Sequence, residues 1–190
     1  MSLRQIALVG VVVLCGGGLF ENWSSTLKMQ VEGQVVHIDG LINSRAYRQF
    51  KRMLNKNPQV VRIEFGEIEG SSDDDIVVDM GYLIRNRGMA TVLPADAQVY
   101  SGGVDLFLAG VRRTVEPGAE IGVHEWADGL GRSGRDFPHG SPHHEPTRKY
   151  IEDMLGTDAF YWFTLEAAAF DDIYIMNRSE MIRFGLITQE

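Results

Sequence analysis

The sequence has almost no cysteine, no surplus of positive charge and no hydrophobic run long enough to cross a membrane comfortably. Its single cysteine, Cys15, excludes an internal disulfide and any zinc site built from cysteines. The formal net charge of −8, without a basic stripe interleaved with aromatic residues, argues against nucleic acid as a partner. We find no phosphate-binding loop of the Walker type. We therefore expect no nucleotide, no other cofactor and no metal.

The N-terminal residues are the exception to this ordinary composition. Arg4 precedes an apolar run from residue 6 to residue 20, and a positive residue before a short apolar run is typical of a secretory signal. The run is shorter than the roughly 20 residues that a membrane-spanning helix needs. Residues 1–22 are therefore predicted to be a signal peptide or a membrane anchor, with an exported, periplasmic or membrane-anchored location. A buried first strand is the alternative, since the run contains consecutive valines.

The rest of the chain alternates between strand-like and helix-like patterns. With 190 residues, 44 % of them hydrophobic, it can form one domain with a full core, which we place at residues 30–190 after a polar linker at 21–30. Strand-helix alternation implies right-handed crossovers and a largely parallel sheet, an α/β fold with surrounding helices. The expected strands are 34–40, 60–65, 91–93, 99–100 and 121–124, and the expected helices are 44–57, 73–88, 102–110, 147–170 and a short one from Ser179.

Three segments allow two interpretations each. Asp73, Asp74 and Asp75 suit the start of a helix, where carboxylates complement the helix dipole, better than a cation site. Residues 125–147 form a long polar stretch whose histidines, His139, His143 and His144, favour a solvated loop over a metal site. The aromatic segment 160–163 fits either a core helix or a contact between subunits.

Ser101 lies where a strand meets an apolar helix. At such a turn the first backbone N–H groups of the helix have no partner within the helix, and they can stabilise an oxyanion beside a serine nucleophile. Gly102 and Gly103 lack a Cβ, so a substrate backbone could approach closely. The simpler alternative is a tight turn capped by serine.

His124 ends the strand that follows this helix. A helix and a loop returning to the neighbouring parallel strand would bring Ser101 and His124 to one edge of the sheet, where open α/β sheets place their sites. Gly70 lies at the end of another strand on that edge. A serine, a base within hydrogen-bond reach and an orienting carboxylate are the requirements of nucleophilic hydrolysis.

The order of these features resembles the ClpP/crotonase superfamily, in particular the Clp protease proteolytic subunit and the exported proteins similar to signal-peptide peptidase A. The matching segments are the loop glycine Gly70, the serine and apolar helix at 101–110, the strand at 121–124 and the ending at 180–187. The resemblance covers the chain from about residue 30 to its C-terminus. It implies a ClpP/crotonase-like fold that assembles into homo-oligomers.

The resemblance also implies roles for individual residues. Ser101 would be the nucleophile and His124 the general base, and Asp172, or Asp171 with a small shift, would complete the triad. The backbone N–H groups of Gly70 and Gly102 would form the oxyanion hole.

These roles lead to a serine hydrolase, of peptidase type, that cleaves a peptide or protein substrate through an acyl-enzyme outside the cytoplasm. Two departures from the family pattern support an alternative, a catalytically inactive peptide-binding or scaffold protein tethered at the membrane. The oxyanion loop has Gly70-Ser71 in place of paired glycines, and two glycines follow Ser101. A crotonase-type enzyme acting on an acyl-CoA is a third hypothesis, which Glu67 and Glu69 keep open.

Overall fold

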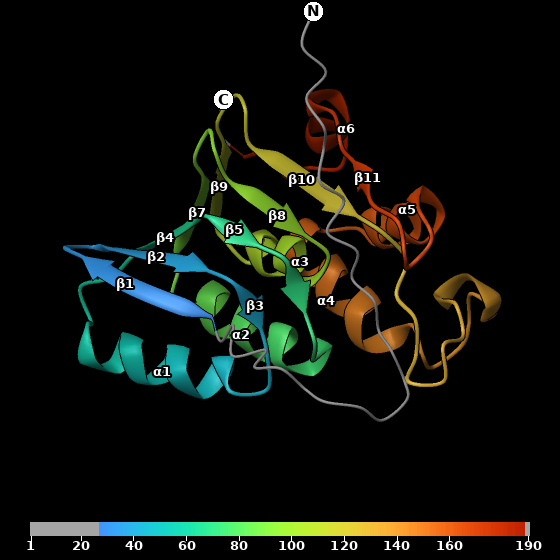
Figure 1. Cartoon of the computed structure of the whole chain (residues 1–190), viewed down its shortest axis with the longest axis horizontal. Coiled ribbons are helices and arrows are strands. Elements are labelled where there is room, and N and C mark those ends of the chain that lie inside the picture. The colour runs from blue at the N-terminus through green and yellow to red at the C-terminus, as the bar shows by residue number, and fades with distance from the viewer. Residues whose placement is uncertain (1–26, 189–190) are drawn as a thin grey trace, which may run out of the picture.

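Residues 27–188 are described by a computed structural model, in which two open sheets and a small third one are surrounded by helices (Figure 1). The larger sheet has the strand order β1-β2-β4-β7-β9 and the second has the order β11-β10-β8-β5, while β3 pairs with β6. The strands are β1 Lys28–Glu32, β2 Val35–Asp39, β3 Leu41–Ile42, β4 Arg62–Phe65, β5 Glu67–Ile68, β6 Gly70–Ser71, β7 Ala90–Leu93, β8 Gln98–Tyr100, β9 Arg112–Val115, β10 Glu120–Val123 and β11 Tyr174–Ile175.

Most neighbouring strands are parallel, as the alternating pattern predicts. Only β1 with β2 and β10 with β11 pair antiparallel among the named strands. The expected α/β class with a largely parallel sheet is therefore confirmed. The expected linker at residues 21–30 is wrong from Lys28 onward, because β1 starts there and pairs with β2 along its whole length. β9 was not predicted, since its sequence Arg112–Val115 begins with two arginines.

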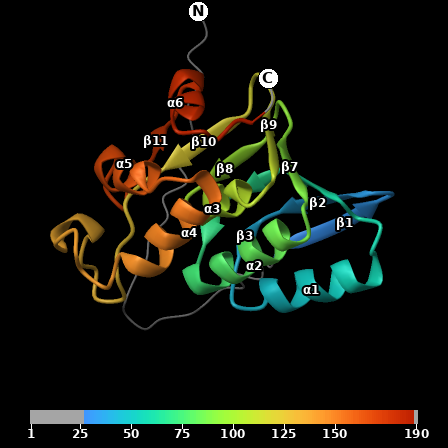
Figure 2. The same ribbon diagram turned by 180° about the vertical axis from the view of Figure 1, so that it is seen from behind.

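Three of the helices, α2, α3 and α4, pack together near the centre of the molecule, while α1 and α6 lie at its periphery (Figure 2). Helix α3 contacts α2, α4, β8 and β10, so it is the helix around which the second sheet packs. Six of its seven residues are buried. The helices are α1 Ala46–Lys56, α2 Asp74–Asn86, α3 Gly102–Leu108, α4 Glu145–Leu155, α5 Ala159–Ala167 and α6 Arg178–Arg183, with a short 3-10 helix η1 at Gly134–Asp136.

Helices α1 and α2 show how the sequence sets the ends of helices. In α1 the buried residues Ala46, Phe50 and Leu54 follow one another at helical spacing and face the core. The helix begins after Arg45, whose side chain does not cap it, so the expected cap at Ser44 is wrong. In α2 the carboxylate of Asp73 accepts the Ile76 N–H at 3.3 Å, which confirms the acidic run as a helix start.

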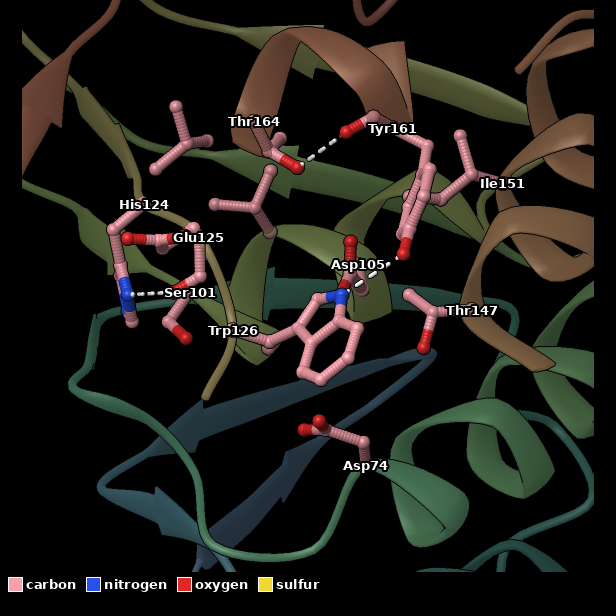
Figure 3. A pocket seen from close by; sticks show the side chains of 13 residues that line it. Asp74, Ser101, Asp105, His124, Glu125, Trp126, Thr147, Ile151, Tyr161 and Thr164 are labelled. Atoms are coloured by element: carbon pink, nitrogen blue, oxygen red, sulfur yellow. Dashed lines mark hydrogen bonds between the residues drawn. The ribbon is translucent and has the colours of Figure 1, made fainter. Parts of the chain in front are cut away.

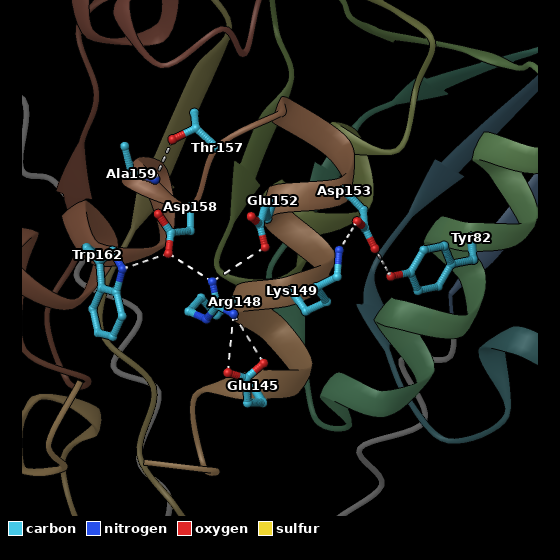
Figure 4. A network of polar contacts seen from close by, with 10 residues as sticks. All are labelled: Tyr82, Glu145, Arg148, Lys149, Glu152, Asp153, Thr157, Asp158, Ala159 and Trp162. Carbon is cyan, nitrogen blue, oxygen red and sulfur yellow. Dashed lines mark hydrogen bonds and ion pairs between the residues drawn. The ribbon is translucent and has the colours of Figure 1, made fainter. Parts of the chain in front are cut away.

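The predicted long helix at 147–170 is two helices. Gly156 adopts a left-handed conformation (φ +81°) and ends α4, a role for which glycine is favoured because it lacks a Cβ. Arg148 of α4 then joins the two helices through an ion pair to Asp158, the residue before α5, and also pairs with Glu152 within α4 (Figure 4). On the other side, Tyr82 of α2 donates to Asp153 of α4 at 2.7 Å. These contacts hold α4 between α2 and α5.

The aromatic segment 160–163 packs inside the domain. Phe160 and Tyr161 are buried, while Trp162 and Phe163 are half-buried against the same core. This supports the interpretation of a core helix. Within residues 27–188, no helix is both long enough and apolar enough to cross a membrane. The predicted signal or anchor at residues 1–22 lies outside the described residues.

Candidate functional site

Ser101 occupies a strained turn between β8 and α3. Its backbone has φ +53° and ψ −128°, and it is the only residue other than glycine with a positive φ between residues 27 and 188. An L-residue in that region carries a steric cost of roughly 1–3 kcal/mol, and such strain is found most often at functional sites. The side chain makes no capping hydrogen bond. The simpler interpretation of Ser101 as a helix cap therefore does not describe its hydroxyl, which lines a pocket instead.

Glycines let the N-terminus of α3 approach the loop that contains β5 and β6. A Cβ added at Gly102 would lie 2.5 Å from the Ser71 Cβ, and one at Gly103 would lie 2.5 Å from the Ile68 side chain. Gly70 has φ +137°, and its added Cβ would lie 3.2 Å from the Ser101 Cβ. The predicted oxyanion residues Gly70 and Gly102 thus both adjoin Ser101, although Gly70 also pairs with Leu41 in the small β3–β6 sheet.

The other end of α3 is fixed by buried donors. Arg85 and Arg113 both donate to the carbonyl of Leu108, at 2.9 and 3.3 Å. Arg113 also donates to Gly110 O at 2.7 Å, and Thr91 Oγ1 donates to Phe107 O at 2.9 Å. These contacts satisfy the carbonyl groups that a helix leaves unpaired at its C-terminus. They hold the helix, and with it Ser101, against the sheet.

His124 follows β10, which runs parallel to β8 and pairs with it directly. Its Nδ1 lies 2.7 Å from the carbonyl oxygen of Glu125. Because a carbonyl only accepts, a neutral ring carries its proton on Nδ1 and keeps the lone pair on Nε2. That tautomer is the one that can accept a proton from a serine. No hydrogen bond joins the Ser101 hydroxyl to the ring among residues 27–188.

The predicted third members, Asp171 and Asp172, lie in the turn just before β11. This strand pairs antiparallel with β10, Tyr174 opposite Val123, so the two aspartates come to the strand end that carries His124. Both are exposed, and the Asp172 carboxylate accepts the Ile173 N–H at 2.8 Å. Among the described residues, neither is hydrogen-bonded to His124. The carbonyl of Glu125, rather than a carboxylate, contacts Nδ1 in this structure.

A pocket opens beside Ser101 and His124, and Figure 3 shows the two residues on one side with the indole of Trp126 between them and Tyr161. The pocket contains side chains that the sequence did not identify. The carboxyl groups of Asp74 and Asp105 line it, and neither has a hydrogen bond or an ion pair from another described residue. The complete lining is Asp74, Ser101, Gly102, Val104, Asp105, Val123, His124, Glu125, Trp126, Thr147, Ile151, Tyr161 and Thr164.

The electrostatics of these carboxyl groups are unusual. Burial raises the pKa of Asp105 to about 7, and the nearby Asp74 adds to the shift. Burial of its carboxyl group also raises the pKa of Asp74, helped by Asp73 and Asp75 and opposed by His124, although the residue as a whole lies at the exposed rim. Asp105 comes four residues after Ser101, a spacing that puts the two on the same side of a helical turn. The sequence therefore did contain a signal for Asp105.

Glu125, next to His124, faces away from the imidazole. It is 3 % exposed, and its carboxylate accepts from the Ser133 hydroxyl and from Arg135 Nε, the latter at 3.0 Å. Burial alone would raise its pKa, but these hydrogen bonds outweigh burial and lower the pKa. Glu125 is therefore an ionised, paired group that fixes the loop after His124.

The loop at 125–147 is not a purely solvated one, because His144 is 1 % exposed. Trp126 Nε1 donates to the Tyr161 hydroxyl at 2.8 Å, Tyr161 lies 2.7 Å from His144 Nδ1, and His144 Nε2 lies 3.3 Å from Phe137 O. An indole N–H only donates and a carbonyl only accepts. Trp126 therefore donates to Tyr161, the Tyr161 hydroxyl donates to His144 Nδ1, and His144 Nε2 donates to the Phe137 carbonyl. The expectation of a solvated loop is wrong for this histidine. No group of three metal-binding side chains occurs in the described part of the chain.

Comparisons with known proteins bear on the fold. No family profile matches the sequence, and no curated protein sequence matches it either. Several solved structures do match. An enoyl-CoA hydratase from Shewanella pealeana has a TM-score of 0.53 at 10 % identity over 85 % of this chain. The 1510-N membrane-bound stomatin-specific protease, as a lysine-to-alanine mutant with a substrate peptide, has a TM-score of 0.51 at 18 % identity over 84 % of this chain.

A third similar structure is Pseudomonas aeruginosa DspI, with a TM-score of 0.55 at 13 % identity over 90 % of this chain. The match covers 69 % of DspI, 75 % of the protease and 66 % of the hydratase, so this chain spans less than two thirds of the hydratase. Identities this low bear on the fold alone. Crotonase-type enzymes and a ClpP-like protease both match, and the chain has the fold of the ClpP/crotonase superfamily.

Proposed function

We propose that the protein is a serine hydrolase of peptidase type, with Ser101 as nucleophile and His124 as general base. The observation that carries this proposal is that Ser101, in a strained turn, and His124, on the adjacent parallel strand, line one pocket. Ser101 Oγ would attack an acyl carbonyl while Nε2 of His124 takes the hydroxyl proton. The imidazolium then protonates the leaving group, and water releases the acyl-enzyme by the reverse sequence.

The developing oxyanion needs donors that are already in place. Gly102 opens α3, so its N–H has no partner one turn earlier in the helix. We assign the second donor to Gly70, whose backbone lies against Ser101. The loss of one such donor in other enzymes lowers the rate by about 100- to 1000-fold.

The position of the proton on His124 does not depend on Asp172 in this arrangement. The Glu125 carbonyl selects the Nδ1–H tautomer, as an orienting aspartate does in a triad. Asp172 would act as third member if its exposed carboxylate turned to the ring when substrate binds. The variants Asp172→Asn and Asp171→Asn show which aspartate, if either, is the third member. Only substitution of the third member should lower the acylation rate, by about 10⁴-fold for a full triad role.

The main test is labelling with a fluorophosphonate probe, which reacts with activated serines. Wild type should label, and Ser101→Ala and His124→Ala should not. Ser141→Ala is a matched control, because Ser141 Oγ lies 3.0 Å from Nδ1 of His143 in an exposed part of the loop. Labelling that persists in Ser101→Ala, or a folded wild type that does not label, would contradict the proposal. The second result would favour the inactive peptide-binding alternative.

The substrate, location and assembly belong to the same proposal. A peptide or protein is the proposed substrate, and the likeness to a protease solved with a substrate peptide supports it. An exported or membrane-tethered location through residues 1–22, and assembly as a homo-oligomer, are proposed from the sequence and the resemblance. Fractionation of cells that express the full chain, and sedimentation of the purified protein, test these two points.

A crotonase-type activity is the second candidate, and one observation favours it. Asp74 and Asp105 present two carboxyl groups with raised pKa to the pocket, and paired carboxyl groups can move a proton to and from an acyl thioester. Ser101→Ala would then retain activity while Asp105→Asn lost it. Calorimetry that measures the binding of an acyl-CoA to the pure protein separates this candidate from the hydrolase.

A further inference from the structure

The pocket beside Ser101 is acidic and unneutralised. Its lining includes three carboxylic acids and, within residues 27–188, no lysine or arginine. Glu125 is already paired with Arg135. Asp74 and Asp105 form no ion pair with a lysine or arginine among the described residues, so they are the carboxyl groups of the pocket that a cationic ligand can pair with.

Asp105 is the more informative of the two. It lies on α3, one turn after Ser101, and its backbone carbonyl accepts the Tyr150 hydroxyl at 2.8 Å, which fixes the residue in place. Its carboxyl group, by contrast, faces the pocket without any donor from the described chain (Figure 3). Asp105 is half-buried, and a charged group that is partly withdrawn from water in a cleft and has no partner points to a ligand that supplies one.

The rest of the lining suits a long side chain that ends in a cation. The buried side chains of Val104 and Ile151 form apolar walls, and the half-buried Trp126 is accessible to methylene groups. The Trp126 indole is held by its bond to Tyr161 and stacks on Phe137, so its orientation beside the pocket is fixed, and the face of an indole attracts cations. Thr147 adds a hydroxyl group.

We propose that this pocket binds the cationic side chain of a lysine or arginine residue in the peptide substrate, with its charged end at Asp105 and Asp74. This proposal rests on the proposed hydrolase function, since it places that residue next to the bond that Ser101 attacks. It commits the substrate to a basic residue at the scissile position. An apolar side chain would leave both carboxyl groups unpaired.

A binding experiment tests the pocket without depending on an active serine. The Ser101→Ala protein is titrated with Nα-acetyl-lysine amide and with Nα-acetyl-norleucine amide, an uncharged analogue that lacks the ammonium group, and the Trp126 indole N–H is followed by NMR. The lysine amide should bind at least tenfold more tightly than norleucine amide. Adding Asp105→Asn should remove most of that preference, whereas Asp75→Asn, on α2 but outside the pocket lining, should keep it.

A labelling experiment then connects the pocket to the chemistry. Diphenyl phosphonates that carry a lysine or a norleucine side chain are compared on otherwise wild-type protein, with a general fluorophosphonate as reference. The lysine probe should react at least tenfold faster than the norleucine probe, and Asp105→Asn should lower that ratio. Equal binding of the two amides, or a preference that survives Asp105→Asn, overturns the proposal. Retained lysine binding without any labelling would instead overturn only the hydrolase function.

Discussion

The two ends of helix α3 differ in almost every respect. At its C-terminal end, Arg85, Arg113 and Thr91 donate to the backbone carbonyls of Leu108, Gly110 and Phe107. At its N-terminal end, Ser101 is held at a positive φ and Asp105 has no partner for its carboxyl group. One end is saturated with hydrogen bonds and the other is strained and unsatisfied. Strain at a site persists only where the surrounding structure enforces it, so the first end is what makes the second possible.

This comparison predicts opposite effects of substitutions at the two ends. Removing a donor at the C-terminal end of α3, which we call the anchored end, should destabilise the fold, because it leaves buried acceptors unpaired. At the N-terminal end, which we call the open end, a substitution that removes the backbone strain or the buried charge should stabilise the fold at the expense of activity. Such a trade-off is common at active sites. The four predictions below run from the largest expected effect to the smallest.

Arg113→Met should have the largest effect. Arg113 is 5 % exposed and donates to four backbone carbonyls, those of Leu108, Gly110, Gly185 and Leu186. Burial, and then the charge of Arg85, lowers its pKa to about 10, so it remains charged at neutral pH. Its loss should lower the free energy of unfolding by about 4 kcal/mol, measured by urea denaturation.

Arg112→Met is the control for Arg113→Met. Arg112 precedes Arg113 in β9, but it is exposed and makes no side-chain hydrogen bond among the described residues. It should change the free energy of unfolding by less than about 0.5 kcal/mol. Similar losses in the two variants would mean that the anchored end is not specifically stabilised by Arg113.

Gly81→Ala tests the contact that supports the first turn of α3, at Asp105. An added Cβ at Gly81 would lie 2.0 Å from the Tyr150 hydroxyl, which itself donates to the carbonyl of Asp105. The clash should cost about 3 kcal/mol even after the gain in helix propensity. Displacement of Tyr150 should also slow labelling of Ser101 several-fold at a temperature where the variant is folded. Gly140→Ala, at an exposed glycine with open space around it, should leave both measurements unchanged.

The difference between the two ends also explains what could be predicted from the sequence. Ser101 and His124 follow the paired parallel strands β8 and β10, as the expected return to a neighbouring strand predicts, although the unpredicted β9 intervenes and joins the other sheet. Arg113, in contrast, finds two of its acceptors at Gly185 and Leu186, more than 70 residues away, and nothing local distinguishes it from its neighbour Arg112. Local patterns thus located the strained end, while the anchored end depends on tertiary contacts.

Two errors have more specific causes. The division of the predicted helix at 147–170 was available in the sequence, because Gly156 is a glycine after an amphipathic helix and ends α4 in the left-handed conformation. The burial of His144 was not available. Its partners Tyr161 and Phe137 lie on different segments, and a histidine in a polar stretch carries no sign of them.

Asp105 should make the stability depend on pH. Burial raises its pKa in the folded state to about 7, above the value near 4 of an unfolded chain, so between these values only the folded state keeps the proton. Stability linked to this group is therefore greatest at low pH and falls as the pH rises from about 4 to about 7. The amide of Asp105→Asn does not ionise in this pH range, so its stability lacks this pH dependence. The variant should be more stable than wild type by about 2 kcal/mol at pH 8, with little difference at pH 4.

The measurement for Asp105 is urea denaturation of both proteins across that pH range. Asp74, His124 and Tyr161 also line the pocket, so the difference between variant and wild type, rather than either curve alone, isolates Asp105. Asp79→Asn, at an exposed position on α2, is the control and should parallel wild type. A difference that is constant from pH 4 to pH 8 would show that the Asp105 carboxyl is not buried at the open end.

Ser101→Gly should have the smallest effect on stability and the most revealing sign. Glycine adopts φ +53° without the steric cost that serine carries, so relief of strain in the folded state should exceed the entropy that glycine adds to the unfolded state. We expect Ser101→Gly to be about 1 kcal/mol more stable than Ser101→Ala, which removes the hydroxyl but keeps the strain. Both variants should lack labelling. Equal stability of the two variants would mean that the turn at Ser101 stores no strain. The hydrogen bonds at the C-terminal end of α3 would then not be holding a strained N-terminal end in place.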